Sequence, residues 1–521
     1  MIRPNRRPSG WIARAPILAV ATALAVAVAR AQDPSPPATA PSTQPAKELT
    51  IELDKATPLD WPEVKEDLKP VSFKTPDGRE GWVMRLPGNR PIATPAVAAG
   101  LIYVGGGYGS HEFYALKAES GAVAWQMATG DDGPTAAVVE DGCVAFNTES
   151  CTVIVTDARS GKVIWQEWLG DPLMRQPAIA DGKLYIAYPG GHPRGVQKQA
   201  QAPATAPQVA PVASVGPAKG TGHRLLCADL KTGKHLWEQD ITADVISAPV
   251  IEGDQVFLTC FDGTSFCIAA SDGKIAWKKE HAGTSAPLVV AGRMLVTAKD
   301  ASKGKTQEGI QQIDATNASD TSSQMLAVGD ARYLDAGAVG NVALSPATQA
   351  ALESSVGFGG GAPAAAQMSK ATKNVNVQTV AAGWAYQGSR VAYANGRCLN
   401  AQGSWINCVA TNDKNGQPRW RVQARGGKGN ADAQRFAPPA LGKDNLYLCG
   451  AAGELLSLAQ EDGSVRFCYT MKHPMAFQPA LSGGNVYVGT ADGYVVCLKT
   501  GDTDADGWTA WGGNAKHNKK D

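Results

Sequence analysis

The chain has 521 residues, and its 49 lysines and arginines against 48 aspartates and glutamates give a formal net charge of +1. Such an even balance argues against a nucleic acid or an anionic surface as the partner. Only 19% of the residues are charged and 57 are glycine, a composition typical of many short strands joined by tight turns.

The first 31 residues have the pattern of a signal peptide. Arginines near the start precede the apolar run PILAVATALAVAVA, and Ala29-Arg30-Ala31 fits a small-x-small cleavage site. The apolar run is short for a membrane span, which favours cleavage over an uncleaved anchor. The first cysteine is Cys143, so no cysteine follows the cleavage site to carry a lipid. We therefore expect an exported protein of the periplasm or cell envelope, with no membrane span after cleavage and no lipid anchor.

Two further segments precede the periodic part of the chain. Residues 32–46, QDPSPPATAPSTQPA, are rich in proline and alanine and are predicted to be a disordered spacer. Residues 47–80 form a mixed N-terminal extension with one strand-like run at 49–53.

Residues 81–502 repeat one phrase: Pro-Ala-Val, an apolar run, a hydrophobic triplet, a turn with glycine, and an aromatic residue. A period of about 40 residues with one aromatic per copy indicates a radial repeat, with one small sheet per copy. The second strands are nearly unbroken apolar runs, which fit sheets covered on both faces. The copies that end in tryptophan do so at Trp125, Trp165, Trp237, Trp277 and Trp420.

Counting the copies predicts an all-β fold, an eight-bladed β-propeller with four-stranded antiparallel blades. The outer strand of the fifth blade is placed at AAGWAYQG, with Trp384, and in the seventh blade Phe467 replaces tryptophan. The eighth copy lacks a fourth strand after Gly501. We expect GWVMRLPG, with Trp82, to fill that position, so that an N-terminal strand joins the last blade and closes the ring.

Two insertions, at about 188–222 and about 316–380, break the period. The first is rich in proline, alanine and glutamine and is predicted to be a disordered surface loop. The second is interpreted either as a flexible tether or as a small partner-binding appendage.

The ten cysteines of an exported chain permit disulfides. Most of them lie at strand positions, where a buried thiol is the simpler interpretation. Two pairs flank predicted hairpin turns and are candidate disulfides: Cys260 with Cys267, and Cys398 with Cys408.

The repeated phrase, PAVxxGxLYVGxxxGxLYALDxxTGKxxW in its general form, resembles the pyrroloquinoline-quinone-like propeller repeat over about residues 81–502. Within that family the signal peptide and the eight blades are most similar to the BamB type of outer-membrane assembly propeller. The resemblance implies that the repeat tryptophans are structural and dock between neighbouring blades, namely Trp82, Trp125, Trp165, Trp237, Trp277, Trp384 and Trp420.

The tail, residues 503–521, resembles tails on other exported proteins of this repeat class. The likeness rests on a short set of residues, and its two tryptophans are expected to pack on the rim of the ring. These residues are Trp508, Trp511, Gly512, Gly513, Asn514, His517 and Asn518.

Residues that could carry chemistry are hard to find in the sequence. Quinoprotein dehydrogenases, which share the repeat, add a Ca²⁺ site of acidic and amide oxygens, an aspartate base and often adjacent cysteines. This chain has no adjacent cysteine pair, no Cys-x-x-Cys-His motif and no metal-ligand spacing among its seven histidines. We therefore expect no catalytic, cofactor-binding or metal-binding residues.

The predicted function is a non-catalytic, monomeric scaffold of the cell envelope that binds proteins through the loops of a propeller face. Outer-membrane protein assembly is the most specific role that the resemblance implies. One alternative is an oxidoreductase dependent on pyrroloquinoline quinone (PQQ) with Ca²⁺. The other is a binder of polysaccharide or of a small ligand.

Overall fold

The structure is a computed structural model, and the chain divides into two compact units, Met1–Thr39 and Ala40–Asp521. Every described residue belongs to the second unit. The signal peptide, nearly all of the spacer, the greater part of both insertions and Trp384 lie outside the described residues. The described residues are 46–131, 133–149, 151–170, 175–190, 223–281, 283–300, 307–322, 324–330, 387–412, 416–427 and 435–520.

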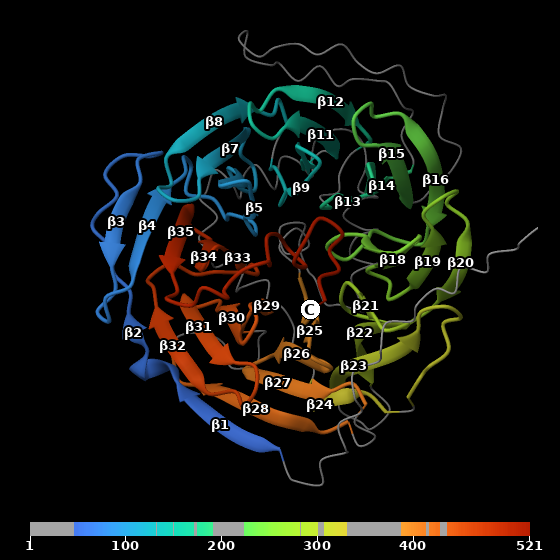
Figure 1. The fold of residues 1–521 in the computed structure, drawn as a ribbon. Helices are drawn as coiled ribbons and strands as arrows, with labels where there is room; N and C mark the ends of the chain where they lie inside the picture. The colour runs from blue at the N-terminus through green and yellow to red at the C-terminus, as the bar shows by residue number, and fades with distance from the viewer. Residues whose placement is uncertain are drawn as a thin grey trace, which may run out of the picture. The chain divides into compact units, whose positions relative to one another are not determined.

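The second unit is a ring of eight β-sheets, which confirms the predicted all-β propeller with eight blades (Figure 1). Five blades have four antiparallel strands each, ordered from the inside of the ring outward. Their strands are β5 (Ala96–Ala98), β6 (Leu101–Gly105), β7 (Glu112–Lys117) and β8 (Val123–Ala128); β9 (Val138–Glu140), β10 (Cys143–Phe146), β11 (Thr152–Asp157) and β12 (Val163–Trp168); β13 (Ala178–Ala180), β14 (Lys183–Pro189), β15 (His223–Asp229) and β16 (His235–Ile241); β17 (Val250–Glu252), β18 (Gln255–Thr259), β19 (Ser265–Ala269) and β20 (Ile275–Lys279); and β21 (Leu288–Val290), β22 (Arg293–Asp300), β23 (Gln307–Asp314) and β24 (Leu326–Asp330).

The last three blades have five strands, because the N-terminal extension adds one strand to the outside of each. The sequence suggested only one such strand. Among the described residues the only helical element is η1 (Leu53–Lys55), and none there could cross a membrane. From the inside outward these blades are β25 (Ala392–Ala394), β26 (Arg397–Gln402), β27 (Trp405–Ala410), β28 (Pro418–Arg425) and β1 (Lys47–Glu52); β29 (Ala440–Leu441), β30 (Asn445–Cys449), β31 (Glu454–Ala459), β32 (Val465–Thr470) and β2 (Thr57–Pro58); and β33 (Ala480–Ser482), β34 (Asn485–Gly489), β35 (Tyr494–Lys499), β4 (Glu80–Arg85) and β3 (Val71–Lys74).

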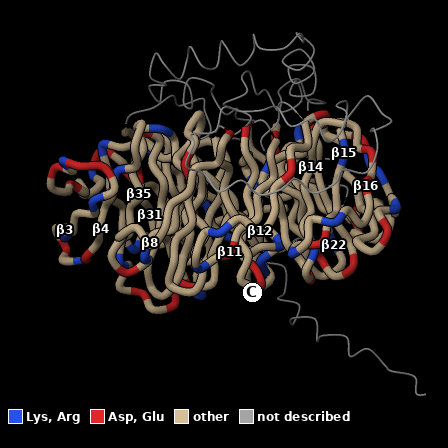
Figure 2. Tube along the Cα trace, turned by 90° about the horizontal axis from the view of Figure 1, so that it is seen from above, with Lys and Arg blue, Asp and Glu red and all other residues tan. Residues whose placement is uncertain are grey.

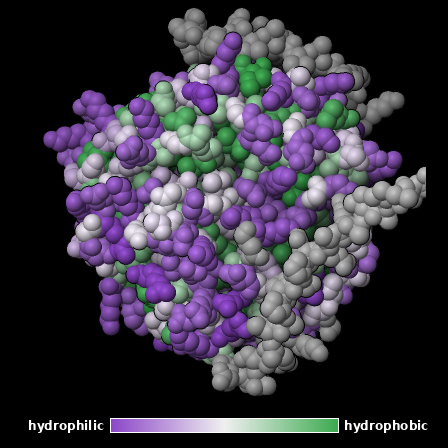
Figure 3. Space-filling view, viewed as in Figure 1, coloured by the Kyte–Doolittle hydropathy of each residue, from purple (hydrophilic) through white to green (hydrophobic). Residues whose placement is uncertain are grey.

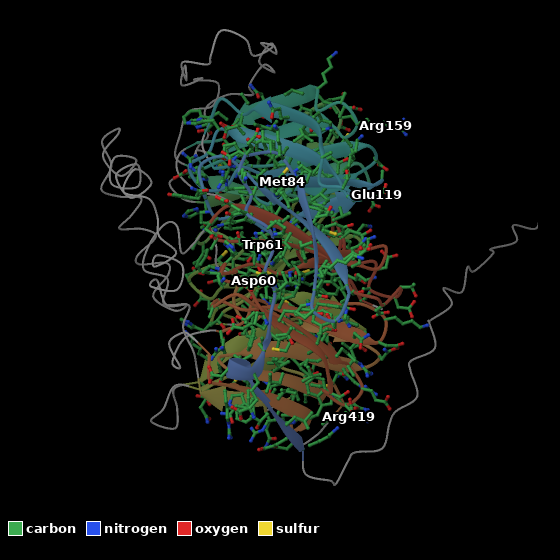
Figure 4. The ribbon with its side chains drawn as sticks, turned by 90° about the vertical axis from the view of Figure 1, so that its left-hand side faces the viewer. Asp60, Trp61, Met84, Glu119, Arg159 and Arg419 are labelled. Atoms are coloured by element: carbon green, nitrogen blue, oxygen red, sulfur yellow. The ribbon has the colours of Figure 1, made fainter. Side chains whose placement is uncertain are left out.

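The ring closes through its ends, as predicted. Strand β4 pairs antiparallel with β35, with Trp82 opposite Cys497, so the eighth blade combines the two ends of the propeller sequence. The segment between β2 and β3 carries the extension from the outside of the seventh blade to the eighth, and Figure 4 labels its residues Asp60 and Trp61. Trp61 stacks on the ring of His473 with 4.7 Å between centroids, and this contact holds the extension against the seventh blade.

The core lies between the blades rather than inside any one of them. Separate clusters of buried apolar side chains, such as those around Trp82, Trp165 and Trp277, fill successive gaps between sheets. Charged residues concentrate at the turns at the two ends of the strands (Figure 2). Seen along the ring axis, hydrophobic residues are scattered among hydrophilic ones on the surface (Figure 3). Because the core lies between the blades, both faces of each sheet are covered. This explains why the second strands are nearly unbroken apolar runs.

A hydrogen bond from each repeat tryptophan ties its blade to the next one. The indole Nε1–H on the outer strand reaches the backbone carbonyl that follows the third strand of the neighbouring blade. The six pairs are Trp82 with Ala118 (3.1 Å), Trp125 with Ala158 (3.1 Å), Trp165 with Leu230 (2.7 Å), Trp237 with Ala270 (3.0 Å), Trp277 with Ala315 (2.8 Å) and Trp420 with Gln460 (3.0 Å).

At the two junctions where the outer strand has no tryptophan, an arginine donates to the corresponding carbonyl oxygen. Arg79, in the turn before β4 of the eighth blade, donates to the carbonyl oxygen of Thr500 of its own blade at 2.9 Å, and it reaches the seventh blade by lying over the ring of Phe467 and donating to the hydroxyl of Tyr469 at 2.7 Å. Between the fifth and sixth blades, Arg293 donates to the carbonyl oxygen of Thr411 at 3.2 Å. The junctions thus share a donor to the same carbonyl, whichever side chain supplies it.

A β-bulge directly before the aromatic residue aims it at the next blade. In six outer strands the register shifts at this point, leaving one residue on the outer strand without a partner on the third strand. Such a bulge increases the local twist and turns the following side chain. Strand β4 pairs with β35 without a shift, and no hairpin turn joins these two strands, because β4 follows β3 of the N-terminal extension.

The turn below five of the six bonding tryptophans has a glycine at a position where a side chain would collide with the indole ring. A Cβ at Gly273, whose φ is +75°, would lie 2.6 Å from the ring of Trp237. In the fifth blade Ala318 has a φ of 62° and packs beside Trp277 instead of a glycine. The turn therefore keeps its left-handed conformation even where alanine replaces glycine, the residue that adopts this conformation without strain.

The predicted outer strand of the fifth blade was wrong. That strand is β24, which precedes the segment AAGWAYQG in the sequence. Trp384 itself lies outside the described residues. Strand β24 has Leu326 and no aromatic residue, and Arg293 on β22 makes the junction bond. The aromatic marker used to find outer strands was therefore absent here, and the second insertion begins only after β24.

The two candidate disulfides were also wrong, because all ten cysteines are free thiols. In the sixth blade Cys398 is opposite Val409 and Cys408 is opposite Leu399, so the two thiols lie on opposite faces of the sheet. Cys260 and Cys267 likewise belong to different clusters between blades. Burial raises the pKa of Cys408 and Cys267 to about 12, as expected for thiols that act as small apolar side chains.

The arginine junction gives a stability test. We expect Arg79→Met to lower the free energy of unfolding by about 1.5–3 kcal/mol, because it removes a hydrogen bond made by a charged donor. Denaturant titration would measure the change. In an Arg79→Met background, Phe467→Trp should restore part of the loss by supplying an indole donor. The exposed Arg159→Ala is the control and should change stability by less than about 0.5 kcal/mol.

Candidate functional site

The centre of the ring is where a propeller could hold a ligand, and here the C-terminal tail fills it. After β35 the chain turns inward, and Figure 1 shows this last segment, in red, inside the circle of inner strands. We call residues 508–520 the plug. Trp508 and Trp511 are each 1% exposed, so they lie within the ring and not on its rim, where the sequence placed them.

The plug continues the hydrogen bonding of the inner strands. In five blades the middle residue of the inner strand donates its backbone N–H to the plug, although a strand at the edge of a sheet would otherwise leave that group unpaired. The pairs are Val97 N to Thr509 O (2.7 Å), Ile179 N to Ala515 O (2.9 Å), Ile251 N to Lys516 O (3.0 Å), Val289 N to Asn518 Oδ1 (2.9 Å) and Leu481 N to Trp508 O (2.7 Å).

Arg390 holds the first half of the plug. Its guanidinium lies over the ring of Trp511, 4.6 Å from the centroid, and donates to the carbonyl oxygens of Pro287 and His517. No carboxylate is among these partners, and burial lowers the pKa of Arg390 to about 9. Gln478 adds a further bond by accepting from the backbone N–H of Gly512 at 2.8 Å.

His517 and Asn518 hold the second half. The ring nitrogens of His517 lie 2.7 Å from the carbonyl oxygen of Trp511 and 2.9 Å from that of Pro177. Burial and the charge of Arg390 lower the pKa of His517 to about 4, although the two carbonyls favour the protonated ring. Asn518 donates to the carbonyl oxygen of Val289 at 2.9 Å while accepting from its N–H, so the side chain imitates a paired strand.

An acidic turn leads into the plug, and it is not among the residues that were predicted to form a site. Residues 502–507, DTDADG, have the alternating acidic pattern of a calcium loop, which is the signal that would have drawn attention to them. In the structure these carboxylates serve other bonds. Asp502 accepts from Asn445 (2.7 Å) and Tyr447 (3.0 Å), and Asp506 accepts from the N–H of Gly483 (3.0 Å).

The residues at the centre do not fit the Ca²⁺ bed of a quinone enzyme. Such a bed needs several carboxylate or amide oxygens that converge on one point. Within the described ranges no three His, Cys, Asp or Glu side chains are placed to hold a metal ion. The charged side chain against the plug tryptophan is a cation, Arg390, which would repel Ca²⁺.

Glu308 is the described carboxyl with the most enzyme-like surroundings. It is 3% exposed and accepts a hydrogen bond from Thr284 Oγ1 at 2.9 Å. Burial raises its pKa, although the bond from Thr284 and the charge of Lys299 lower it. A carboxyl perturbed in this way is a candidate general acid or base. Glu308 could not be singled out from the sequence, because the residues that surround it come from three separate stretches of chain.

Most of the chain matches the model of one protein family. The family model described as outer membrane protein assembly factor BamB matches residues 70–202, 195–383 and 402–515. The chain belongs to the BamB family. The matched segments run across all eight blades and include most of the plug.

Two curated relatives match shorter parts of this chain. The outer membrane protein assembly factor BamB of Yersinia pestis is 26% identical over 197 residues, which are 35% of this chain and 42% of that protein. A tetrathionate hydrolase of Acidithiobacillus ferrooxidans is 23% identical over 221 residues, 41% of this chain and 40% of that protein. The chain thus spans less than half the length of the curated relatives it matches.

A solved structure supports the fold alone. The computationally designed protein Ika8 aligns with a TM-score of 0.51 and 12% sequence identity, covering 80% of this chain and 98% of that chain. This similarity extends to the ring of blades and carries nothing about function.

The plug gives the second stability test. We expect Trp511→Ala to lower the free energy of unfolding by about 3–5 kcal/mol, since it empties a buried aromatic site at the centre of the ring. Thermal and denaturant unfolding would measure it. Trp405, whose ring is only half-buried, is the matched control, and Trp405→Ala should have a smaller effect. Equal losses in the two variants would contradict a central role for the plug.

His517 predicts a pH dependence. Its pKa is lowered from 6.5 to about 4 in the folded protein, so the unfolded chain binds the proton more readily between these values. The stability that His517 contributes is therefore complete above about pH 6.5 and falls by at most about 1.4 kcal/mol per pH unit down to pH 4. We expect His517→Gln to show a weaker loss of stability than the wild type between pH 7 and pH 4.5, measured by denaturant titration.

Proposed function

We propose that this protein is exported to the cell envelope and acts there as a non-catalytic scaffold that binds other proteins, in the assembly of outer-membrane proteins. The family match along the blades carries this proposal. The description of that family and the name of the Yersinia pestis relative both point to outer-membrane protein assembly. The plug adds support, because it fills with the chain's own side chains the space in which a propeller enzyme would keep a cofactor.

An enzyme is the second candidate, and two observations favour it. A curated relative is named as a tetrathionate hydrolase. Glu308 is a buried carboxyl with a raised pKa, as a general acid or base requires. The quinone-dependent oxidoreductase is the form of this candidate that the repeat resembles, and the charge of Arg390 argues against its Ca²⁺.

Crosslinking in living cells tests the proposal. A tagged chain expressed in its own host would be crosslinked in the envelope, purified and analysed by mass spectrometry. We expect components of outer-membrane protein assembly to be recovered in stoichiometric amounts. Recovery of no envelope protein above an untagged control would contradict the scaffold.

An absorbance titration tests the alternative on the same purified protein. Addition of PQQ with Ca²⁺ should give no saturable absorbance change if the protein is a scaffold. A saturable change together with dye reduction that Glu308→Gln abolishes would overturn the proposal and establish the enzyme. Arg159→Ala, at an exposed turn, is the control for the variant.

A further inference from the structure

The outer strands of the ring divide into covered and open ones. The N-terminal extension covers the outer edges of the sixth, seventh and eighth blades with β1, β2 and β3. The outer strands of the other five blades, β8, β12, β16, β20 and β24, have no further strand among the described residues. An open edge presents unpaired backbone N–H and C=O groups and is a template for another strand.

The sixth blade shows how this fold receives an added strand. Strand β1 runs parallel to β28, with Leu49 opposite Val422 and Ile51 opposite Ala424. The strand covers the apolar side of the edge, so that Trp420 is 1% exposed and Val422 is fully buried. Glu48 pairs with Arg421 on the other side of the strand. Aliphatic residues at alternate positions of the added strand thus cover the apolar side of the outer strand, formed by Trp420 and Val422.

Strand β8 has a similar apolar side, but no added strand lies over it among the described residues. Trp125 and Met127 hold the positions of Trp420 and Val422 and are only half-buried. Ala124, Gln126 and Ala128, on the other side of the strand, are exposed. The bulge before Trp125 also matches the one before Trp420. An added strand like β1 would therefore bury on the first blade what β1 buries on the sixth.

Charge distinguishes β8 from the other open edges. Its sequence, VAWQMA, contains no charged residue. Charged side chains on an edge strand are a common protection against pairing with other chains. Each of the other four open strands has at least one charged residue in its sequence: Glu167 on β12; Glu238 and Asp240 on β16; Lys278 and Lys279 on β20; and Asp330 on β24.

We propose that β8 is a docking edge for an extended segment of a partner protein, which adds parallel to it with an aliphatic side chain at every second residue. The inference rests on the proposed scaffold function and names the surface and the kind of partner. A second copy of this chain is a poorer occupant. Two β8 strands related by a two-fold axis would pair antiparallel, whereas the strands that add to the bulged edges β28 and β32 are parallel.

A peptide with the sequence of residues 46–53, AKELTIEL, is the probe, because this segment already adds to an edge of the ring. It would carry a fluorophore for anisotropy, and the intact exported protein would carry a photo-crosslinking amino acid at Ala128. We expect saturable binding and a crosslink at Ala128. A crosslinker at Ala276, on the lysine-bearing edge β20, should give none. The control peptide has asparagine in place of Leu49 and Ile51.

Two variants test the register of docking. Gln126 corresponds to Arg421, so Gln126→Arg should tighten binding about two- to fivefold through the peptide's Glu48. A peptide with Glu48→Lys should lose this gain. Met127→Lys should weaken binding by about tenfold or more, because it removes the aliphatic contact. Since Gln126 is exposed, its variant keeps the test informative if Met127→Lys does not fold.

Other outcomes would overturn the proposal. These are no binding at millimolar peptide, equal binding of the control peptide, or crosslinks only at Ala276 or at Arg425 on the already covered β28. A concentration-dependent dimer that Met127→Lys abolishes would show that the occupant is a second copy. If the peptide fails to bind while envelope proteins are still recovered by crosslinking, the proposal that β8 is a docking edge is wrong. The proposed scaffold function is then still supported.

Discussion

The structure depends on one hydrogen bond that six of the eight junctions share, from a tryptophan on the outer strand of one blade to the carbonyl oxygen that follows the third strand of the next. Apolar contacts between sheets are not directional, so they do not by themselves fix the angle between blades. A bond to one fixed carbonyl does. Arg293, which makes this bond from the fifth blade to the sixth, shows that the constraint is on the donor and not on the aromatic ring. The bulge and the left-handed turn below the ring, including Ala318, are the local adjustments that bring donor and acceptor together.

The sequence predicted what repeats and failed where the repeat is interrupted. Eight blades and closure through Trp82 follow from a phrase that recurs with one aromatic residue, and both are present. The fifth outer strand was misplaced because Leu326 has no aromatic character and its substitute, Arg293, comes from another strand. The cysteine pairs failed for a different reason. Their spacing gives no information on register, and a shift of one residue moves a thiol to the opposite face of the sheet.

The central site was only half visible in the sequence. The residues of the plug could be singled out, since the motif stands apart from the repeat, but its place could not be inferred. A single segment has no second copy from which its partners could be read. His517 and Asn518 bind backbone groups of inner strands that lie far away in the chain, and a backbone group leaves no mark in the sequence. The same holds for Arg390, whose partners near the plug are an aromatic ring and two carbonyl oxygens.

The eighth blade, which closes the ring, can form only after nearly the whole chain has been synthesised. Arg79 and the carbonyl of Thr500, which it binds, are 421 positions apart in the chain. Strand β4 is therefore synthesised long before β35, its partner on the inner side, exists. Until then β4 and the extension have exposed edges and apolar faces. Contacts of such long range also slow folding, because the chain between them must first be gathered into the ring. Before the ring closes, the blades that have formed make an open arc. Molecular chaperones would encounter the protein in this form.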